Sequence, residues 1–161
     1  ENTCAEEGKK ENGTVQQGFV TCEVSGGLGN QLFQIATCFA AALDNNLRFC
    51  PIKTESAYTF GGKRPVYWSS IFKGFTCIDA AEGMLGVESL KESSFCFSKL
   101  PVLAANSRTK LVGYFQSYRY FDHVHDQLLS TLSFDMDLVQ HIAGLLRHFA
   151  SSLFVSPSAS A

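Results

Sequence analysis

Hydrophobic and polar residues follow two different periods along the first third of the chain, and together they predict a β-α-β unit. Residues 19–24 are apolar or β-branched except for Glu23, and they predict a strand. Three glycines lie in the turn after it, and an apolar stripe then recurs at helical spacing. The stripe consists of Leu32, Ala36, Phe39 and Leu43. The polar residues 44–46 end this helix, and 47–52 predict a second strand. Such a unit normally builds a parallel sheet through a right-handed crossover.

The middle of the chain has a weaker pattern. Residues 53–70 are predicted to be irregular, and 71–78 form a short apolar segment whose type the pattern leaves open. Residues 94–100 predict a strand that ends at Pro101, and residues 110–117 predict a buried strand. Strands that alternate with helices indicate the α/β class.

Two helical patterns follow in the last third. The first presents an apolar face that consists of Phe121, Val124, Leu128 and Leu132, with His125 beside it. The second has a stripe that consists of Leu138, Ile142, Leu145 and Phe149. Asp135 or Asp137 is the predicted N-cap of this final helix.

The composition is that of a folded domain with a polar tail. The length of 161 residues predicts one domain or slightly more, and 45% hydrophobic with 17% charged residues predicts a globular chain. Residues 1–18 are polar and are predicted to be disordered, and residues 156–161 look like a truncated end. A net charge of −2 argues against a nucleic-acid partner. No apolar run reaches 18 residues, so no transmembrane helix is predicted; a membrane anchor outside this chain is left open.

The cysteines and histidines do not form a metal motif. No two of the six cysteines are spaced as a CxxC pair. Cys22, Cys38 and Cys50 lie in apolar segments and are predicted to be buried thiols, although the even number leaves disulfides open in a secreted chain. His123 and His125 would point about 200° apart on a helix, so they cannot share one ion. We therefore expect no metal cofactor.

The strongest candidate for a site is the segment 25–34, Ser-Gly-Gly-Leu-Gly-Asn-Gln-Leu-Phe-Gln, between the first strand and the first helix. A glycine turn there gathers backbone N–H groups at the positive end of the helix, which favours a phosphate or another anion. It is not the dinucleotide fingerprint, because Leu32 stands in place of the third glycine. It is not a P-loop, because no Gly-Lys-Ser/Thr follows. The alternative is that the glycines only close the β-α turn.

A second candidate cluster is the segment 114–121, Tyr-Phe-Gln-Ser-Tyr-Arg-Tyr-Phe, at the expected carboxyl end of a strand. Open α/β sheets bind ligands at that edge. Aromatic rings beside Gln116, Ser117 and Arg119 suit a sugar, since the rings face its apolar side and the polar groups face its hydroxyls. The alternative is a core of aromatic residues beside an ordinary turn.

Three segments, in this order, resemble the α-1,2-fucosyltransferase family, glycosyltransferase family eleven. They are residues 25–36, residues 64–72 (Arg-Pro-Val-Tyr-Trp-Ser-Ser-Ile-Phe) and residues 112–121 with their Gly-Tyr-Phe-Gln-Ser block. The resemblance covers residues 19 to about 135. These residues resemble only the N-terminal part of that family. It implies a Rossmann-like lobe over residues 19–155, one half of a two-lobed, GT-B-like enzyme whose donor-binding lobe is absent from this chain.

The resemblance also implies an activity. Members of the family transfer fucose from GDP-fucose to a sugar hydroxyl, commonly the 2-hydroxyl of galactose, with inversion and without a metal. The expected partners are therefore a nucleotide sugar and a galactose-containing glycan acceptor. The residues expected to bind them are Gly27, Gly29, Asn30, Gln31, Gln116 and Ser117. Animal-type members resemble Golgi membrane proteins and bacterial ones look cytoplasmic, so the compartment stays open.

The chain departs from the family in one respect. The family's donor motif, His-x-Arg-Arg-x-Asp, should follow the last helix, yet this sequence has no adjacent arginines. That pair would neutralise the diphosphate and the leaving group, so we expect the chain alone to be inactive, with the catalytic residues unknown. Two other interpretations stay open. One is a non-catalytic sugar- or nucleotide-binding module related to the family, and the other is an unrelated α/β protein with a structural glycine turn.

Overall fold

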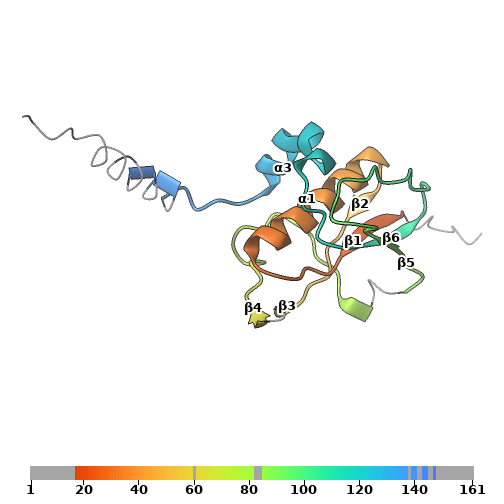
Figure 1. The fold of residues 1–161 in the computed structure, drawn as a ribbon, viewed down its shortest axis with the longest axis horizontal. Helices are drawn as coiled ribbons and strands as arrows, with labels where there is room; N and C mark the ends of the chain where they lie inside the picture. The colour runs from red at the N-terminus through yellow and green to blue at the C-terminus, as the bar shows by residue number, and fades with distance from the viewer. Residues whose placement is uncertain are drawn as a thin grey trace, which may run out of the picture.

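The computed structural model describes residues 17–59, 61–81 and 85–137, together with residues 139, 140, 143, 144 and 147. A four-stranded parallel sheet in the order β2-β1-β6-β5 lies at its centre, and helix α1 packs against it (Figure 1). The strands are β1 (Phe19–Cys22), β2 (Arg48–Phe49), β5 (Glu88–Lys91) and β6 (Arg108–Val112). The prediction of an α/β, Rossmann-like lobe with a parallel sheet is confirmed.

The predicted β-α-β unit is present. Helix α1 (Leu28–Asp44) leaves the carboxyl end of β1 and returns the chain to β2, which pairs parallel to β1. Both strands are shorter than the predicted segments, and β2 has only two residues. The pairing extends beyond β2, because the backbone N–H of Cys50 donates to Val20 O and that of Ile52 to Cys22 O.

The apolar stripe predicted for α1 is buried only in part: Ala36 is 4% exposed and Leu32 packs against the core. Leu43 of the predicted stripe is 44% exposed, whereas Ile35 and Cys38 are fully buried and Ala42 almost so. The buried face is therefore rotated toward smaller side chains. Small residues allow the helix axis to lie close to the sheet, and dense packing there contributes more than the larger but outlying leucine.

Two other predictions in the middle of the chain were wrong. Part of the region expected to be irregular forms an antiparallel hairpin of β3 (Ala57–Thr59) and β4 (Gly62–Arg64). Residues 94–100 are not a strand, and the edge strand β5 lies before them. The edge strand β5 was missed because an edge strand pairs on one side only and needs few apolar residues. The segment 94–100 is apolar because Phe97 packs from a loop on the ring of Tyr120, with centroids 4.8 Å apart.

The predicted strand over 110–117 is confirmed only as far as Val112. Beyond it the backbone turns, because Phe115 has a φ of +52° and cannot continue an extended strand. Two 3₁₀ turns, η1 (Tyr118–Tyr120) and η2 (Asp122–Val124), precede helix α3 (His125–Thr131). Val124 and Leu128 of the predicted helical face are buried.

Several predictions fall outside the described residues. They concern the tail over residues 1–16, the end at 156–161 and the apolar stripe of the final helix. Within the described part of the chain, no helix is long and apolar enough to cross a membrane.

The cysteine predictions fit the structure. Cys22, Cys38 and Cys50 are buried, as expected. Burial raises the pKa of the Cys38 thiol well above its ordinary value, and its neighbour Cys22 raises it further. Burial also raises the pKa of Cys77, against a smaller opposite effect of the Lys53 charge. Cys96 is exposed.

Candidate functional site

The order of the strands marks one edge of the sheet as the place for a ligand. The chain goes from β1 to β2 on one side of β1, and β6 later pairs with β1 on its other side. In open parallel sheets this change of direction leaves a crevice outside the carboxyl ends of the two central strands. A cleft of about 350 Å³ lies there, lined by residues that follow β1, by residues in and after β6, by Ser56 just before β3 (Ala57–Thr59) and by Tyr58 within β3.

The glycine loop borders this cleft through Ser25. Gly26 has a φ of +81°, and a Cβ at this position would collide with the side-chain amide of Asn30. Its backbone N–H donates to Tyr58 O at 3.1 Å, which holds the β3 segment beside the loop. Gly26 is therefore required by the turn itself, whatever the loop binds.

Gly27 and Gly29 differ from Gly26, because nothing lies within 4 Å of a Cβ built at either position. Both are exposed. Gly27 is the N-cap of α1 and no side chain caps the helix, so the helix does not use Asn30 as its cap. Within the described part of the chain, the backbone N–H groups of Leu28, Gly29 and Asn30 have no acceptor. The first turn of α1 thus presents free donors to open space.

Asn30 and Gln116, predicted as site residues from two separate segments, are in direct contact. Gln116 Nε2 donates to Asn30 Oδ1 at 2.7 Å. The structure therefore brings the glycine loop and the loop after β6 together at the carboxyl edge of the sheet. Ser117 lies in the same loop, where its backbone N–H donates to Phe115 O.

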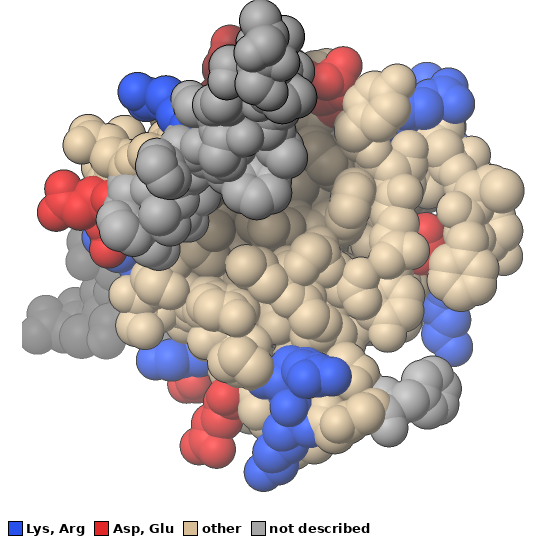
Figure 2. Space-filling model, turned by 60° about the vertical axis from the view of Figure 1, so that its left-hand side comes forward, with Lys and Arg blue, Asp and Glu red and all other residues tan. Residues whose placement is uncertain are grey.

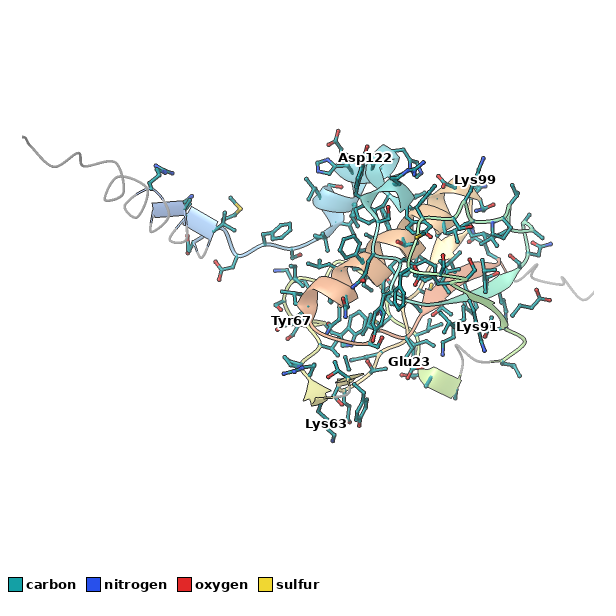
Figure 3. The ribbon with its side chains drawn as sticks, viewed as in Figure 1. Glu23, Lys63, Tyr67, Lys91, Lys99 and Asp122 are labelled. Atoms are coloured by element: carbon teal, nitrogen blue, oxygen red, sulfur yellow. The ribbon has the colours of Figure 1, made fainter. Side chains whose placement is uncertain are left out.

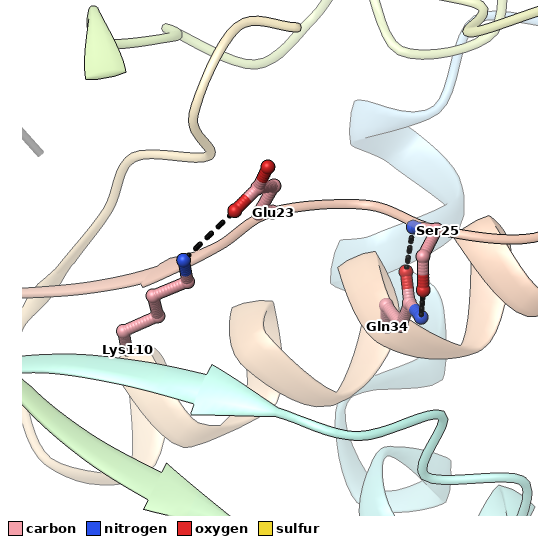
Figure 4. Close-up of polar contacts among 4 residues, drawn as sticks. All are labelled: Glu23, Ser25, Gln34 and Lys110. Carbon is pink, nitrogen blue, oxygen red and sulfur yellow. Dashed lines mark hydrogen bonds and ion pairs between the residues drawn. The ribbon is translucent and has the colours of Figure 1, made fainter. Parts of the chain in front are cut away.

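Gln31 has a different place from its neighbours, because its side chain is fully buried. Its Nε2 donates to Gly26 O at 3.0 Å and to Pro65 O at 2.8 Å. Its amide thus ties the glycine loop to the segment 64–72. A reciprocal pair supports the start of the same loop, since Ser25 N donates to Gln34 Oε1 and Gln34 Nε2 to Ser25 Oγ (Figure 4).

A carboxylate that the sequence analysis missed fixes the loop after β6. Glu92 Oε2 accepts from the backbone N–H groups of Tyr114 at 2.8 Å and Phe115 at 3.0 Å. The buried Phe115 ring packs edge-on against Tyr120, with centroids 5.5 Å apart. These contacts hold the left-handed backbone of Phe115, and the next residue is Gln116. Glu92 follows a polar strand that the pattern did not predict, so no sequence signal pointed to it.

An ion pair crosses the floor of the cleft. Lys110 Nζ lies 2.9 Å from Glu23 Oε2, and the lysine side chain is 13% exposed against 56% for the glutamate (Figure 4). Lys110 lies in β6 and Glu23 directly after β1, and the pairing of these two strands explains how they meet across a separation of 87 residues. Sequence reasoning missed this pair because neither residue belongs to a motif.

The two histidines have separate partners. His123 Nε2 lies 2.8 Å from Asp44 Oδ1, and His125 Nδ1 lies 3.1 Å from Asp126 Oδ1. The described residues contain no group of three or more His, Cys, Asp or Glu side chains arranged to hold a metal ion.

The side of the molecule that carries the amino end of α1 has a largely uncharged centre, with Lys, Arg, Asp and Glu toward its rim (Figure 2). An apolar groove between α1 and α3 is lined by residues that include Leu32, Phe33, Leu129 and Phe134.

A comparison of the chain with protein-family models, with curated proteins and with solved structures gives no significant match.

Proposed function

We propose that this chain is the acceptor-side lobe of an inverting glycosyltransferase of the α-1,2-fucosyltransferase type, with a two-lobed, GT-B-like parent. Its glycine loop would border the GDP-fucose site, and the cleft between β1 and β6 would take the galactoside. Transfer would join the acceptor's hydroxyl oxygen to the anomeric carbon of fucose and release GDP.

The hydrogen bond between Gln116 and Asn30 is the observation that carries the proposal. The three segments that resemble the family are far apart in the sequence. In the fold the first bonds to the third through Asn30 and to the second through Gln31 and Pro65. A structural glycine turn alone would not require the other two segments to meet it.

The groups at this edge match the proposed ligands. Free N–H groups at the first turn of α1 suit a diphosphate, because they add to the positive end of the helix dipole. The cleft adds the exposed ring of Tyr58, the Ser56 side chain and the Glu23–Lys110 pair. An aromatic face with hydroxyl and charged groups beside it suits a sugar, whose ring is apolar on its faces and polar at its edge.

The absence of adjacent arginines from the sequence favours a second candidate function, a non-catalytic module that binds the sugar or the nucleotide. The two candidates differ in turnover and agree on the site. The chain should bind its ligands without transferring fucose unless a donor lobe supplies the missing guanidinium groups.

Calorimetric titration of the purified chain with GDP-fucose and, separately, with lactose tests the proposal. The variants Asn30→Ala and Gln116→Ala should each weaken binding about threefold to tenfold, as expected for loss of one polar contact. Gln127→Ala, at an exposed position of α3, is the matched control and should bind as the unaltered chain does.

Each result has one meaning. Binding that the two site variants weaken supports the proposal. In a mixture of both ligands, release of GDP together with fucose joined to lactose would show that the chain is active alone. Binding of lactose or GDP-fucose that neither variant changes would place the site elsewhere. If the folded chain binds neither ligand at millimolar concentration, the glycine loop is structural and the proposal fails.

A further inference from the structure

A second pocket lies at the opposite end of α1 from the glycine loop, and the proposed function does not use it. It encloses about 300 Å³ between the carboxyl end of α1, the loop 97–102 and the two 3₁₀ turns η1 and η2. Lys99, which lines it, lies on the other side of the molecule from Glu23 of the first cleft (Figure 3). A volume of this size is at the small end of ligand sites.

The walls of this pocket are held by specific contacts. The rings of Phe97 and Tyr120 pack with centroids 4.8 Å apart, and Tyr120 Oη accepts from the backbone N–H of Ser98. Asn45 joins the other two walls, because its Nδ2 donates to Ala41 O and its Oδ1 accepts from Leu103 N. The pocket is therefore formed without a ligand, which lowers the entropy that binding must overcome.

Three carbonyl groups near the carboxyl end of α1 are hydrogen-bonded, so they do not point unpaired into the pocket. Asn45 Nδ2 donates a hydrogen bond to the carbonyl oxygen of Ala41. The backbone N–H of Leu47 donates to Ala42 O, and that of Asn46 donates to Leu43 O. The one carboxylate that lines the pocket, Asp44, is engaged by His123 at 2.8 Å.

Two cations at this pocket have no such partner. The guanidinium carbon of Arg119 lies 4.2 Å from the centroid of the Phe97 ring, a cation–π contact, and the Arg119 side chain is exposed. Neither Arg119 nor Lys99 has an acidic partner within the described part of the chain. The pocket thus combines aromatic and aliphatic side chains with two cations that form no ion pair, beside the single carboxylate of Asp44.

We propose that this pocket binds a small organic oxyanion, a carboxylate or a phosphate monoester carried on an apolar body. Arg119 would pair with two oxygens of the anion through its planar fork, and Lys99 would add a point charge. The body of the ligand would lie on Phe97, Leu100 and Tyr120. A fully hydrated anion such as inorganic phosphate would leave these side chains uncovered and bind more weakly.

Calorimetric titration with phenyl phosphate and with phenylacetate tests the inference, with benzyl alcohol as the uncharged analogue and inorganic phosphate as the anion without a body. We expect both aromatic anions to bind, and both controls to bind at least tenfold more weakly. Arg119→Gln should weaken the aromatic anions about tenfold or more, and Lys99→Gln about threefold. Arg119→Lys, which keeps the charge and loses the fork, should fall between the unaltered chain and Arg119→Gln.

The matched controls are Arg64→Gln and Lys91→Gln, which remove the same charges from exposed strand positions away from the pocket. Neither should change binding of the two aromatic anions. Binding should also weaken as salt rises from 50 to 300 mM, an observation on the unaltered chain that needs no variant.

Three results would overturn the inference. Failure of the unaltered chain to bind either aromatic anion below about 10 mM would leave the pocket without this ligand class. Equal binding of benzyl alcohol would make the cations irrelevant. An equal loss in Arg64→Gln and Arg119→Gln would indicate a general effect of charge. None of these results bears on the glycine loop, so this inference and the proposed function fail independently.

Discussion

Gln116 Nε2 donates to Asn30 Oδ1 at 2.7 Å, across a separation of 86 residues. The bond is exposed, so its contribution to stability should be small even if it positions the site. We expect Asn30→Ala and Gln116→Ala each to lower the unfolding free energy by about 0.5–1 kcal/mol, with the double variant losing less than the sum. Urea unfolding of the four chains measures the coupling. Strict additivity would show that the two side chains do not interact in solution.

The glycines of the loop should respond in opposite directions to alanine. Gly26→Ala should lower the unfolding free energy by about 1–2 kcal/mol or more, because φ is +81° and the new Cβ would meet Asn30. Gly29→Ala should raise it by up to about 1 kcal/mol, since the position is helical and nothing lies near the added methyl group.

The Gly29→Ala variant also distinguishes a structural role of Gly29 from a role in binding. If the open space at Gly29 receives a ligand, Gly29→Ala will be more stable and will bind GDP-fucose more weakly. A Gly29→Ala chain that is stabilised and binds GDP-fucose unchanged would remove this glycine from the proposed site.

Gln31 should prove to be a structural residue. Gln31→Leu keeps the side-chain volume but leaves the carbonyls of Gly26 and Pro65 without their donor. We expect a loss of about 2 kcal/mol in unfolding free energy, since an unsatisfied buried group costs about 1–3 kcal/mol. Gln127→Leu on the exposed face of α3 is the control and should change stability by less than about 0.5 kcal/mol. Equal stability of the two variants would contradict the structure.

The order of elements could be predicted where local pattern and tertiary packing agree. The apolar run before the glycines and the helical period after them were sufficient for β1, α1 and the parallel connection to β2. The face that α1 buries could not be predicted from hydrophobicity alone. How closely a helix approaches a sheet depends on side-chain size as well, and Cys38 and Ala42 are buried while Leu43 is 44% exposed.

The candidate site could be predicted only where it lies on motifs. Asn30 and Gln116 stand in recognisable segments, and the fold places them in contact. The sequence could not predict the roles of Glu92, Glu23 and Lys110. Each of them contacts a residue that is far away in the sequence and close only in the folded sheet. Gln31 shows the converse, since it stands in a motif and was expected to line the ligand cleft, yet its side chain is buried.

Glu92 is expected to stabilise the loop that carries Gln116. Its carboxylate accepts from two backbone N–H groups, and bonds to a charged acceptor are stronger than neutral ones. We expect Glu92→Ala to cost about 1.5–3 kcal/mol and Glu92→Gln roughly half of that, whereas Glu88→Ala on the exposed strand β5 should cost less than about 0.5 kcal/mol.

The loop itself offers a second measurement for Glu92. In nuclear magnetic resonance spectra, the amide signals of Tyr114 and Phe115 should lose their protection from hydrogen exchange in Glu92→Ala and keep most of it in Glu92→Gln. Unchanged protection in Glu92→Ala would mean that another group holds the loop.

The buried thiols predict how labelling depends on exposure and pH. Burial raises the pKa of Cys38 and of Cys77, and a raised pKa lowers the fraction of reactive thiolate at any pH below it. With a thiol reagent at pH 8, exposed Cys96 should react before half-buried Cys77. Cys38 should react only when the chain unfolds. Peptide mapping by mass spectrometry assigns each modified residue, and early labelling of Cys38 would contradict its burial.

The same shift makes stability depend on alkaline pH. An unfolded chain loses the Cys38 proton near the ordinary thiol pKa, whereas the folded chain keeps it to a higher pH because burial raises the pKa of this thiol. The contribution of Cys38 to the unfolding free energy is therefore complete below the unfolded pKa. It falls as pH rises above that pKa, by at most about 1.4 kcal/mol per pH unit.

Urea unfolding at pH 8, 9 and 10 should show a smaller decline in unfolding free energy for Cys38→Ala than for the unaltered chain. Cys96→Ala, at an exposed position, should follow the unaltered chain. Because alanine also leaves a small cavity, the test compares the slopes with pH; parallel slopes for Cys38→Ala and the unaltered chain would show that this thiol is not the group that loses its proton.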